Sequence, residues 1–174
     1  DAITTGNQNV AVGASALGSC TTGGSNVAVG RSALLNNTAS NNTAVGFEAL
    51  ENNTTGTVNV AVGVAALENN TTANNNVAVG YNALNDNTTG TRNVAVGATS
   101  LDATTTSDNN TAVGAGALTN STAAENTGIG SDALEDCTSG YGKLAVGRLA
   151  GYNIRSGQYN VSVGYRAGDN ITTG

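Results

Sequence analysis

The sequence predicts an all-β fold, a parallel β-solenoid of ten coils with about 17 residues in each coil. The first observation is a motif, Asn-Val-Ala-Val-Gly-x-x-Ala-Leu, that recurs along all 174 residues. The second is its spacing of 16 or 17 residues, which leaves no room for a linker or a second domain. The third is the content of 26 Asn, 25 Thr and 24 Gly, which disfavours helices. The motif glycines are Gly13, Gly30, Gly46, Gly63, Gly80, Gly97, Gly114, Gly130, Gly147 and Gly164.

The elements of one repeat follow from positions numbered relative to this glycine. Positions −3 to −1, most often Val-Ala-Val, alternate as a short strand does, and the glycine ends that strand. Positions +1 to +4 are predicted to form a second short strand. The Asn, Thr and Gly residues from +6 onward are typical of turns. Two short strands per coil give a flattened β-roll, and ten coils at about 4.8 Å each give a rod of about 48 Å.

The alternation also predicts which side chains face inward. We expect the valine-rich positions −3 and −1 to point into the roll, opposite the leucine at position +4, so that each coil buries three large aliphatic side chains. Position −2 is then outward, and it is Ala in eight coils. Strands usually contain little Ala, so an outer column of Ala indicates close packing against another chain. In the last two coils position +4 is Gly, and Ile154 and Ile171 at position +7 are expected to fill the space.

Position +7 carries the polar interior that the sequence predicts. It holds Asn37, Asn53, Asn70 and Asn87 in four successive coils, a pattern that predicts a hydrogen-bonded amide ladder. Cys20 and Cys137 share this column but lie seven coils apart, about 34 Å at the strand spacing. A disulfide needs Cα atoms within about 7 Å, so we expect two buried free thiols, with no basic partner beside either.

The composition excludes several classes of function. The chain has no His, so neither a Ser-His or Cys-His nucleophile nor an imidazole metal site is available. No pair of carboxylates recurs at a fixed offset, and we expect no enzyme, no cofactor and no metal site. A net charge of −6 with only six basic residues argues against a nucleic-acid partner. No apolar run approaches the length that spans a bilayer, so no membrane insertion is expected.

Two surfaces remain as candidates for function. Positions +1 and +2 vary between coils, and Phe47, Tyr81, Arg148 and Tyr165 are the best candidates for contacts with a receptor, a glycan or a neighbouring chain. An ordinary role at the rim of an interface is an equally good interpretation of these four residues. Threonine recurs at position +8 in nine coils, as an ice-binding face would require, although turn chemistry also favours Thr there.

The repeat resembles those of known surface fibres. It is similar to the head repeats of trimeric autotransporter adhesins, and more similar to repeats of phage tail fibres and related bacterial surface proteins. The stretch Asn42-Thr43-Ala44-Val45-Gly46 through Asn53-Thr54-Thr55-Gly56 is nearly such a unit, and Val163-Gly164-Tyr165-Arg166-Ala167-Gly168 resembles another variant. The resemblance implies a left-handed parallel β-roll, a parallel homotrimer, and a location outside the cell, at a cell surface or on a virion.

The two ends of the chain share one phase of the repeat. Residues 1–6 and 169–174 both occupy positions +5 to +10. We therefore expect residues 1–174 to form one domain without caps, either a segment of a longer fibre or a rod that stacks end to end into a filament. The expected function is a structural shaft module of a fibre, filament or adhesin, whose rim residues contact a host or cell surface. The alternative is an ice-binding solenoid that uses the threonine rows.

Overall fold

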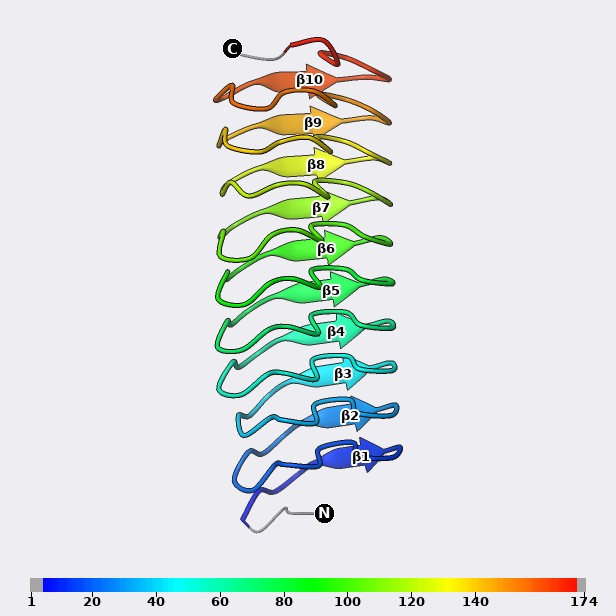
Figure 1. The fold of residues 1–174 in the computed structure, drawn as a ribbon, viewed down its shortest axis with the longest axis vertical. Helices are drawn as coiled ribbons and strands as arrows, with labels where there is room; N and C mark the ends of the chain where they lie inside the picture. Colours follow the sequence, from blue (N-terminus) through cyan, green and yellow to red (C-terminus); the bar gives the residue numbers. More distant parts are fainter. Residues whose placement is uncertain (1–4, 172–174) are drawn as a thin grey trace.

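The computed structural model, which describes residues 5–171, is a parallel β-solenoid of about nine turns (Figure 1). The predicted all-β class and the period of about 17 residues are confirmed. Ten three-residue strands, one per coil, form a single parallel sheet in chain order, from β1 at one end of the rod to β10 at the other. The strands are β1 (Val10–Val12), β2 (Val27–Val29), β3 (Thr43–Val45), β4 (Val60–Val62), β5 (Val77–Val79), β6 (Val94–Val96), β7 (Thr111–Val113), β8 (Thr127–Ile129), β9 (Leu144–Val146) and β10 (Val161–Val163).

Equal positions of the repeat lie beside one another along the whole sheet. Ala61 of β4 pairs with Ala78 of β5, and every other pair of neighbouring strands keeps the same phase. The 16-residue coils do not disturb this register, because Ala28 still pairs with Ala44. The missing residue is therefore absorbed in the turn that precedes the strand, where the chain tolerates a change of length.

The prediction of a second strand in each coil is wrong. Positions +1 to +6 form turns, and the described residues contain one strand per coil. Leucine at position +4 has a φ between 51° and 54° in the eight coils that carry it, a conformation that costs an L-residue about 1–2 kcal/mol. Stacking offsets this cost, because the Leu34 amide donates to the Ala49 carbonyl of the next coil at 3.0 Å and the side chain is fully buried.

The repeat glycine is required by two independent constraints. Its φ lies between 125° and 144° in every coil, a region that side chains other than glycine rarely adopt. A Cβ atom placed on Gly80 would also lie 2.5 Å from the Gly97 carbonyl oxygen of the next coil. The glycine column thus lets successive coils approach at the end of each strand.

The side chains of each strand point the opposite way from our prediction, with position −2 inward and positions −3 and −1 outward. Ala at position −2 is 0% exposed from Ala28 to Ala145, whereas the side chains at −3 and −1 are half-buried or exposed. The interior is too thin for valine, since even a Cβ added at Gly128 would lie 3.3 Å from Leu118 Cγ across the roll. The core therefore consists mainly of Ala at −2, Ala at +3 and Leu at +4, with one large aliphatic side chain per coil rather than three.

The two isoleucines that were predicted to fill the space of the missing leucine differ in their burial. Ile154 is buried, and its Cδ1 lies 3.1 Å from the place that a Cβ of Gly151 would occupy, so it fills the space of the missing leucine as predicted. Ile171, in the last described coil, is 40% exposed. Residues 1–4 and 172–174 lie outside the described residues. The expectation of uncapped ends depends in part on these residues, and they include Thr172 of the threonine column. No helix in the part of the chain that the structure describes has the length and apolarity needed to cross a membrane.

Candidate functional site: the outer faces and the interior polar columns

The outward side of the sheet is lined by the side chains at positions −3 and −1, which we call the valine face. Its members include Val62 (36% exposed) on β4 and Val163 (65% exposed) on β10. The face runs over all ten strands in one register. Its −1 column is Val or Ile in every coil, whereas its −3 column is apolar in seven coils and Thr in three (Thr43, Thr111 and Thr127). Large exposed apolar surfaces on proteins are commonly places of contact with another molecule. The apolar outer columns are therefore valine, where the sequence had predicted alanine.

The four predicted contact residues share one column, position +1, next to the glycine that ends each strand. Phe47, Tyr81 and Tyr165 are exposed, as is Arg148. The structure brings Arg148 over the Tyr165 ring, with its guanidinium carbon 5.9 Å from the ring centre. Phe47 and Tyr81 lie two coils apart in the N-terminal half of the chain. The guanidinium carbon of Arg31, one coil before Phe47, lies 5.2 Å from the Phe47 ring centre.

The threonine column at position +8 is regular over the middle of the rod. The hydroxyls of Thr38, Thr54, Thr71 and Thr88 each donate to the backbone carbonyl of the threonine one coil further on, at 2.8–3.0 Å. These bonds fix one side-chain orientation in successive coils. An open groove runs beside this column, and it is lined by Asn36, Asn52, Thr54, Asn69, Thr71, Asp86, Thr88 and Thr105.

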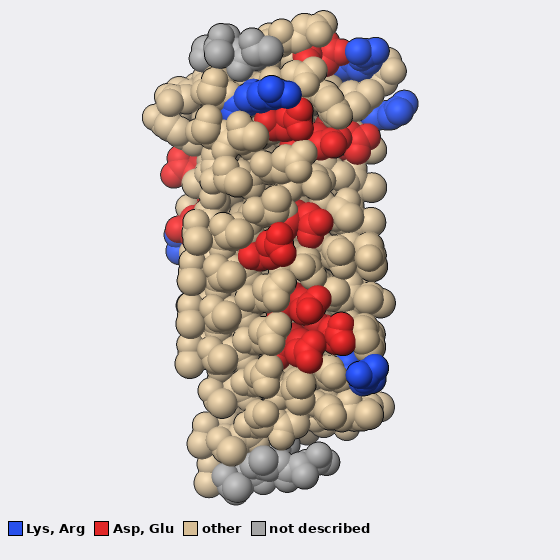
Figure 2. Space-filling view, in the orientation of Figure 1, with Lys and Arg blue, Asp and Glu red and all other residues tan. Residues whose placement is uncertain are grey.

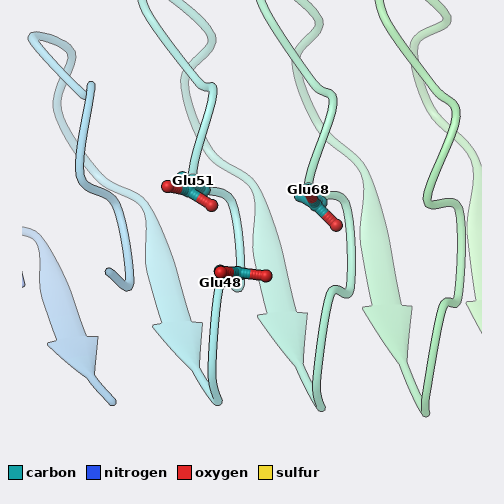
Figure 3. Close-up of side chains that lie close together, drawn as sticks. All are labelled: Glu48, Glu51 and Glu68. Atoms are coloured by element: carbon teal, nitrogen blue, oxygen red, sulfur yellow. The ribbon is translucent and has the colours of Figure 1, made fainter. Parts of the chain in front are cut away.

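Acidic side chains gather in a column on the side of the rod drawn in Figure 2. At one point Glu48 and Glu51 of one coil meet Glu68 of the next, with carboxylate oxygens within 4.8 Å of one another (Figure 3). Burial raises the pKa of Glu51, and repulsion from Glu48 and Glu68 raises it further. Oxygens of this type ligate Ca²⁺, but partly exposed carboxylates also cluster on surfaces without any ion.

The predicted asparagine ladder at position +7 is confirmed. Asn53 Nδ2 donates to Asn37 Oδ1 at 2.6 Å, Asn70 to Asn53 at 2.7 Å, and Asn87 to Asn70 at 3.0 Å. All four side chains are fully buried. The ladder ends where Thr104 replaces asparagine, and Asn87 Oδ1 has no partner among the described residues.

A second asparagine column, at position −4, was not predicted. Its side-chain oxygen accepts the backbone amide of the same position in the next coil, as in the 3.0 Å bond from Asn59 N to Asn42 Oδ1. Its Nδ2 donates to a carbonyl in the turn of its own coil, as from Asn42 to Gly56 at 2.8 Å. The signal was present in the sequence, because position −4 is Asn in nine of the ten coils.

The two cysteines are buried and free, as predicted, but they differ in their surroundings. Each thiol lies 3.5 Å from the carbonyl oxygen three residues ahead, Gly23 for Cys20 and Gly140 for Cys137. Burial raises the pKa of the Cys20 thiol. The expectation that neither cysteine has a basic partner is wrong for Cys137, because Lys143 Nζ lies 3.1 Å from its sulfur.

Lys143 was missed although the sequence marks it. It is the single residue at position −4 that is not asparagine, and it lies in the repeat that also has cysteine at position +7.

Comparison of the chain with protein-family models, with curated proteins and with solved structures found no match to any of them.

Proposed function

We propose that this chain is a structural shaft module of an extracellular fibre, filament or adhesin, at a cell surface or on a virion, that associates with copies of itself through the valine face. The observation that carries this proposal is the outward −1 column, which is Val or Ile on all ten parallel strands, beside a −3 column that is apolar on seven of them. Leaving these columns in water would be unfavourable, and burying them yields about 25 cal/mol for each Å² of apolar surface.

A second copy of the same chain is the occupant that best fits such a face. Two copies aligned in parallel present the same coil spacing, so each outward side chain at −3 or −1 meets the equivalent side chain of the other copy at every level of the rod. A partner of another architecture would match this spacing over only a short distance. The resemblance of the repeat to trimeric fibre proteins favours three chains and a left-handed roll.

The mechanical role follows from the interior. Buried amide ladders and backbone hydrogen bonds link each coil to the next, and identical stacked contacts make a rod stiff. The rim column at position +1 lies two residues beyond the valine face along the chain. In the assembled fibre Phe47, Tyr81, Arg148 and Tyr165 would edge the contact between chains or bind a receptor or glycan outside it.

Analytical ultracentrifugation of the purified chain tests self-association. We expect a trimer for the natural sequence and a monomer for the double variant Val62→Lys/Val79→Lys, because both changes place charge in the middle of the valine face. The matched control is Thr55→Lys, which places one charge on an exposed residue outside both columns and should leave the trimer intact.

Circular dichroism separates loss of assembly from loss of folding. The lysine side chains can point to solvent in the monomer, so β-type spectra are expected for all three proteins. A natural chain that stays monomeric at high concentration would overturn the proposal. A double variant that remains fully trimeric would show that the valine face is not the contact.

The second candidate function is ice binding, which the shared orientation of the threonines at position +8 favours. A flat row of hydroxyls at the coil spacing can order water on one face. The measurement is thermal hysteresis of the natural chain beside Thr71→Tyr, whose bulky ring would interrupt the row. Hysteresis that the variant loses supports this function, and its absence in the natural chain removes it.

A further inference from the structure

At one place in the rod, two positions that face each other, +7 and −4, both carry a residue other than asparagine and come into contact. At position +7 Cys137 replaces asparagine, and at position −4 of the following strand Lys143 replaces it. In a regular coil these two positions face each other inside the roll, as Asn42 Nδ2 and Asn37 Oδ1 do at 3.3 Å. The paired replacement therefore converts an amide–amide contact into an amine–thiol contact at the same site.

The amine is held against the sulfur by its surroundings. Lys143 is 2% exposed, although a lysine side chain is almost never buried without a partner of opposite charge. Its Nζ lies 3.1 Å from Cys137 Sγ, and the three ion pairs among the described residues all involve arginines. A Cβ on Gly140 would lie 2.2 Å from Nζ, so the glycine in this turn leaves the space that the amine occupies.

We propose that Cys137 and Lys143 form a reversible covalent cross-link, in which one oxygen atom joins Sγ to Nζ. The separation of 3.1 Å is one that a single bridging atom spans after a small closing movement. Both side chains are buried, and the sulfur lies closer to Nζ, at 3.1 Å, than to the Gly140 carbonyl oxygen, at 3.5 Å. The site is thus a modification site whose chemistry is oxidative.

The reaction balances with dioxygen as the oxidant. The neutral amine and the thiol react with one O₂ to give the N–O–S bridge and one water. One N–H bond, the S–H bond and the O–O bond break, while the N–O and O–S bonds form. Sulfur and nitrogen each lose two electrons, and dioxygen takes up all four. The second oxygen atom leaves as water with the two displaced hydrogens, and a thiol reductant reverses the bridge as it does other sulfenyl derivatives.

Cys20 is a matched control within the same molecule. Its sulfur is equally buried and lies at the same 3.5 Å from a turn carbonyl. The residue in the place of Lys143 is Asn26, whose Nδ2 is engaged with the Ala39 carbonyl at 2.8 Å. Any difference in oxidation between the two cysteines therefore reports on the lysine rather than on burial.

The test uses the fact that Lys143 is the only lysine in the chain. The purified full chain is kept in air or without oxygen, then unfolded in urea, treated with a thiol-alkylating reagent and digested with a lysine-specific protease. Without the bridge, the protease cuts once, into residues 1–143 and 144–174. With it, we expect an uncut chain, a mass gain of about 14 Da, one alkylated cysteine instead of two, and recovery of cleavage after reduction.

Three variants assign the signal. Lys143→Asn restores the asparagine of position −4, and Cys137→Asn places at position +7 the residue that Asn37, Asn53, Asn70 and Asn87 have there. Both variants should fold, and both should lose the mass gain. Cys20→Asn should keep it. A chain that is cut normally in air, or that gains oxygen at Cys137 while Lys143 remains cleavable, would overturn the proposal. A loss of about 2 Da would indicate a direct S–N bond and would overturn the oxygen bridge.

Discussion

The fold depends on single buried amides as well as on large apolar side chains. Asn70 both donates to Asn53 at 2.7 Å and accepts from Asn87 at 3.0 Å. A buried polar group that loses its partner costs about 1–3 kcal/mol, which is comparable to the about 1.5–3 kcal/mol gained by burying the one leucine of each coil. The interior of the roll is therefore specified by hydrogen bonding at least as much as by packing.

Removal of one amide from the ladder should be strongly destabilising. We expect Asn70→Ala to lower the free energy of unfolding by about 2–4 kcal/mol, because Asn53 Oδ1 loses its donor and Asn87 Nδ2 loses one of its two acceptors. Urea denaturation followed by circular dichroism measures this change. The control is Asn52→Ala, which removes a residue of the outer, half-buried amide row and should change stability by less than about 1 kcal/mol. Equal effects of the two variants would contradict a special role of the buried ladder.

The turn segments that face the acidic side of the rod carry an electrostatic cost. After β3, Glu48 and Glu51 lie in one turn segment, and Glu68 lies in the equivalent segment after β4 (Figure 3). Burial is the first cause of the raised pKa of Glu51, and its two acidic neighbours are the next. Because identical turns stack in register, any charge at one turn position is placed against the charge at the same position in the next coil.

The raised pKa fixes the sign of the pH dependence. Between the ordinary carboxyl pKa and the raised one, the folded chain binds more protons than the unfolded chain, so this contribution to stability falls as pH rises through that window. We expect Glu51→Gln to raise stability at pH 7 by a few tenths of a kcal/mol and to flatten the pH profile in the range just above the ordinary carboxyl pKa. Urea unfolding across that range measures both effects.

Glu48→Gln serves as the graded comparison for this prediction. It removes one source of repulsion but leaves the burial of Glu51 unchanged, so it should flatten the profile only in part. A Glu51→Gln protein whose stability still falls with rising pH as steeply as the natural chain would show that Glu51 does not carry the effect.

The molecule as a whole is a stack in which each coil contacts mainly its two neighbours. Neighbouring strands pair in chain order along the sheet, and no strand pairs across a gap. The stability of such a rod is close to a sum over coils and the contacts between them. Removing one complete period should therefore preserve the fold, whereas removing part of a period should not.

Deletion of residues 64–80 tests this additivity, because it joins Gly63 to Tyr81 at the same phase of the repeat. We expect an intact β-type spectrum and a denaturant m-value lower by about a tenth, since one of ten coils no longer contributes surface. The control deletion, residues 64–71, removes about half a period and should disrupt the register of all following strands. Similar spectra for the two deletions would contradict the stacked arrangement.

Much of this fold can be derived from the sequence because it repeats. The period, the position of the strand before each glycine, the leucine column, the asparagine ladder at +7 and the free thiols all follow from residues that recur at fixed offsets. The contact residues Phe47, Tyr81, Arg148 and Tyr165 could be placed in one column for the same reason. Which of them meet was not predictable, since a ring and a guanidinium pair only when neighbouring coils bring them together.

Three-dimensional packing decided the remaining features. The alternation of side chains along the strand shows that position −2 faces away from −3 and −1, but it does not show which side is inside. The interior takes alanine at −2, because leucine from the opposite wall already fills the thin roll. Backbone closure replaced the expected second strand with turns of positive φ. The contact between Lys143 and Cys137 likewise exists only because the roll folds positions −4 and +7 against each other. The sequence by itself therefore determined the periodic unit, and the tertiary structure decided its inside, its outside and its one amine–thiol pair.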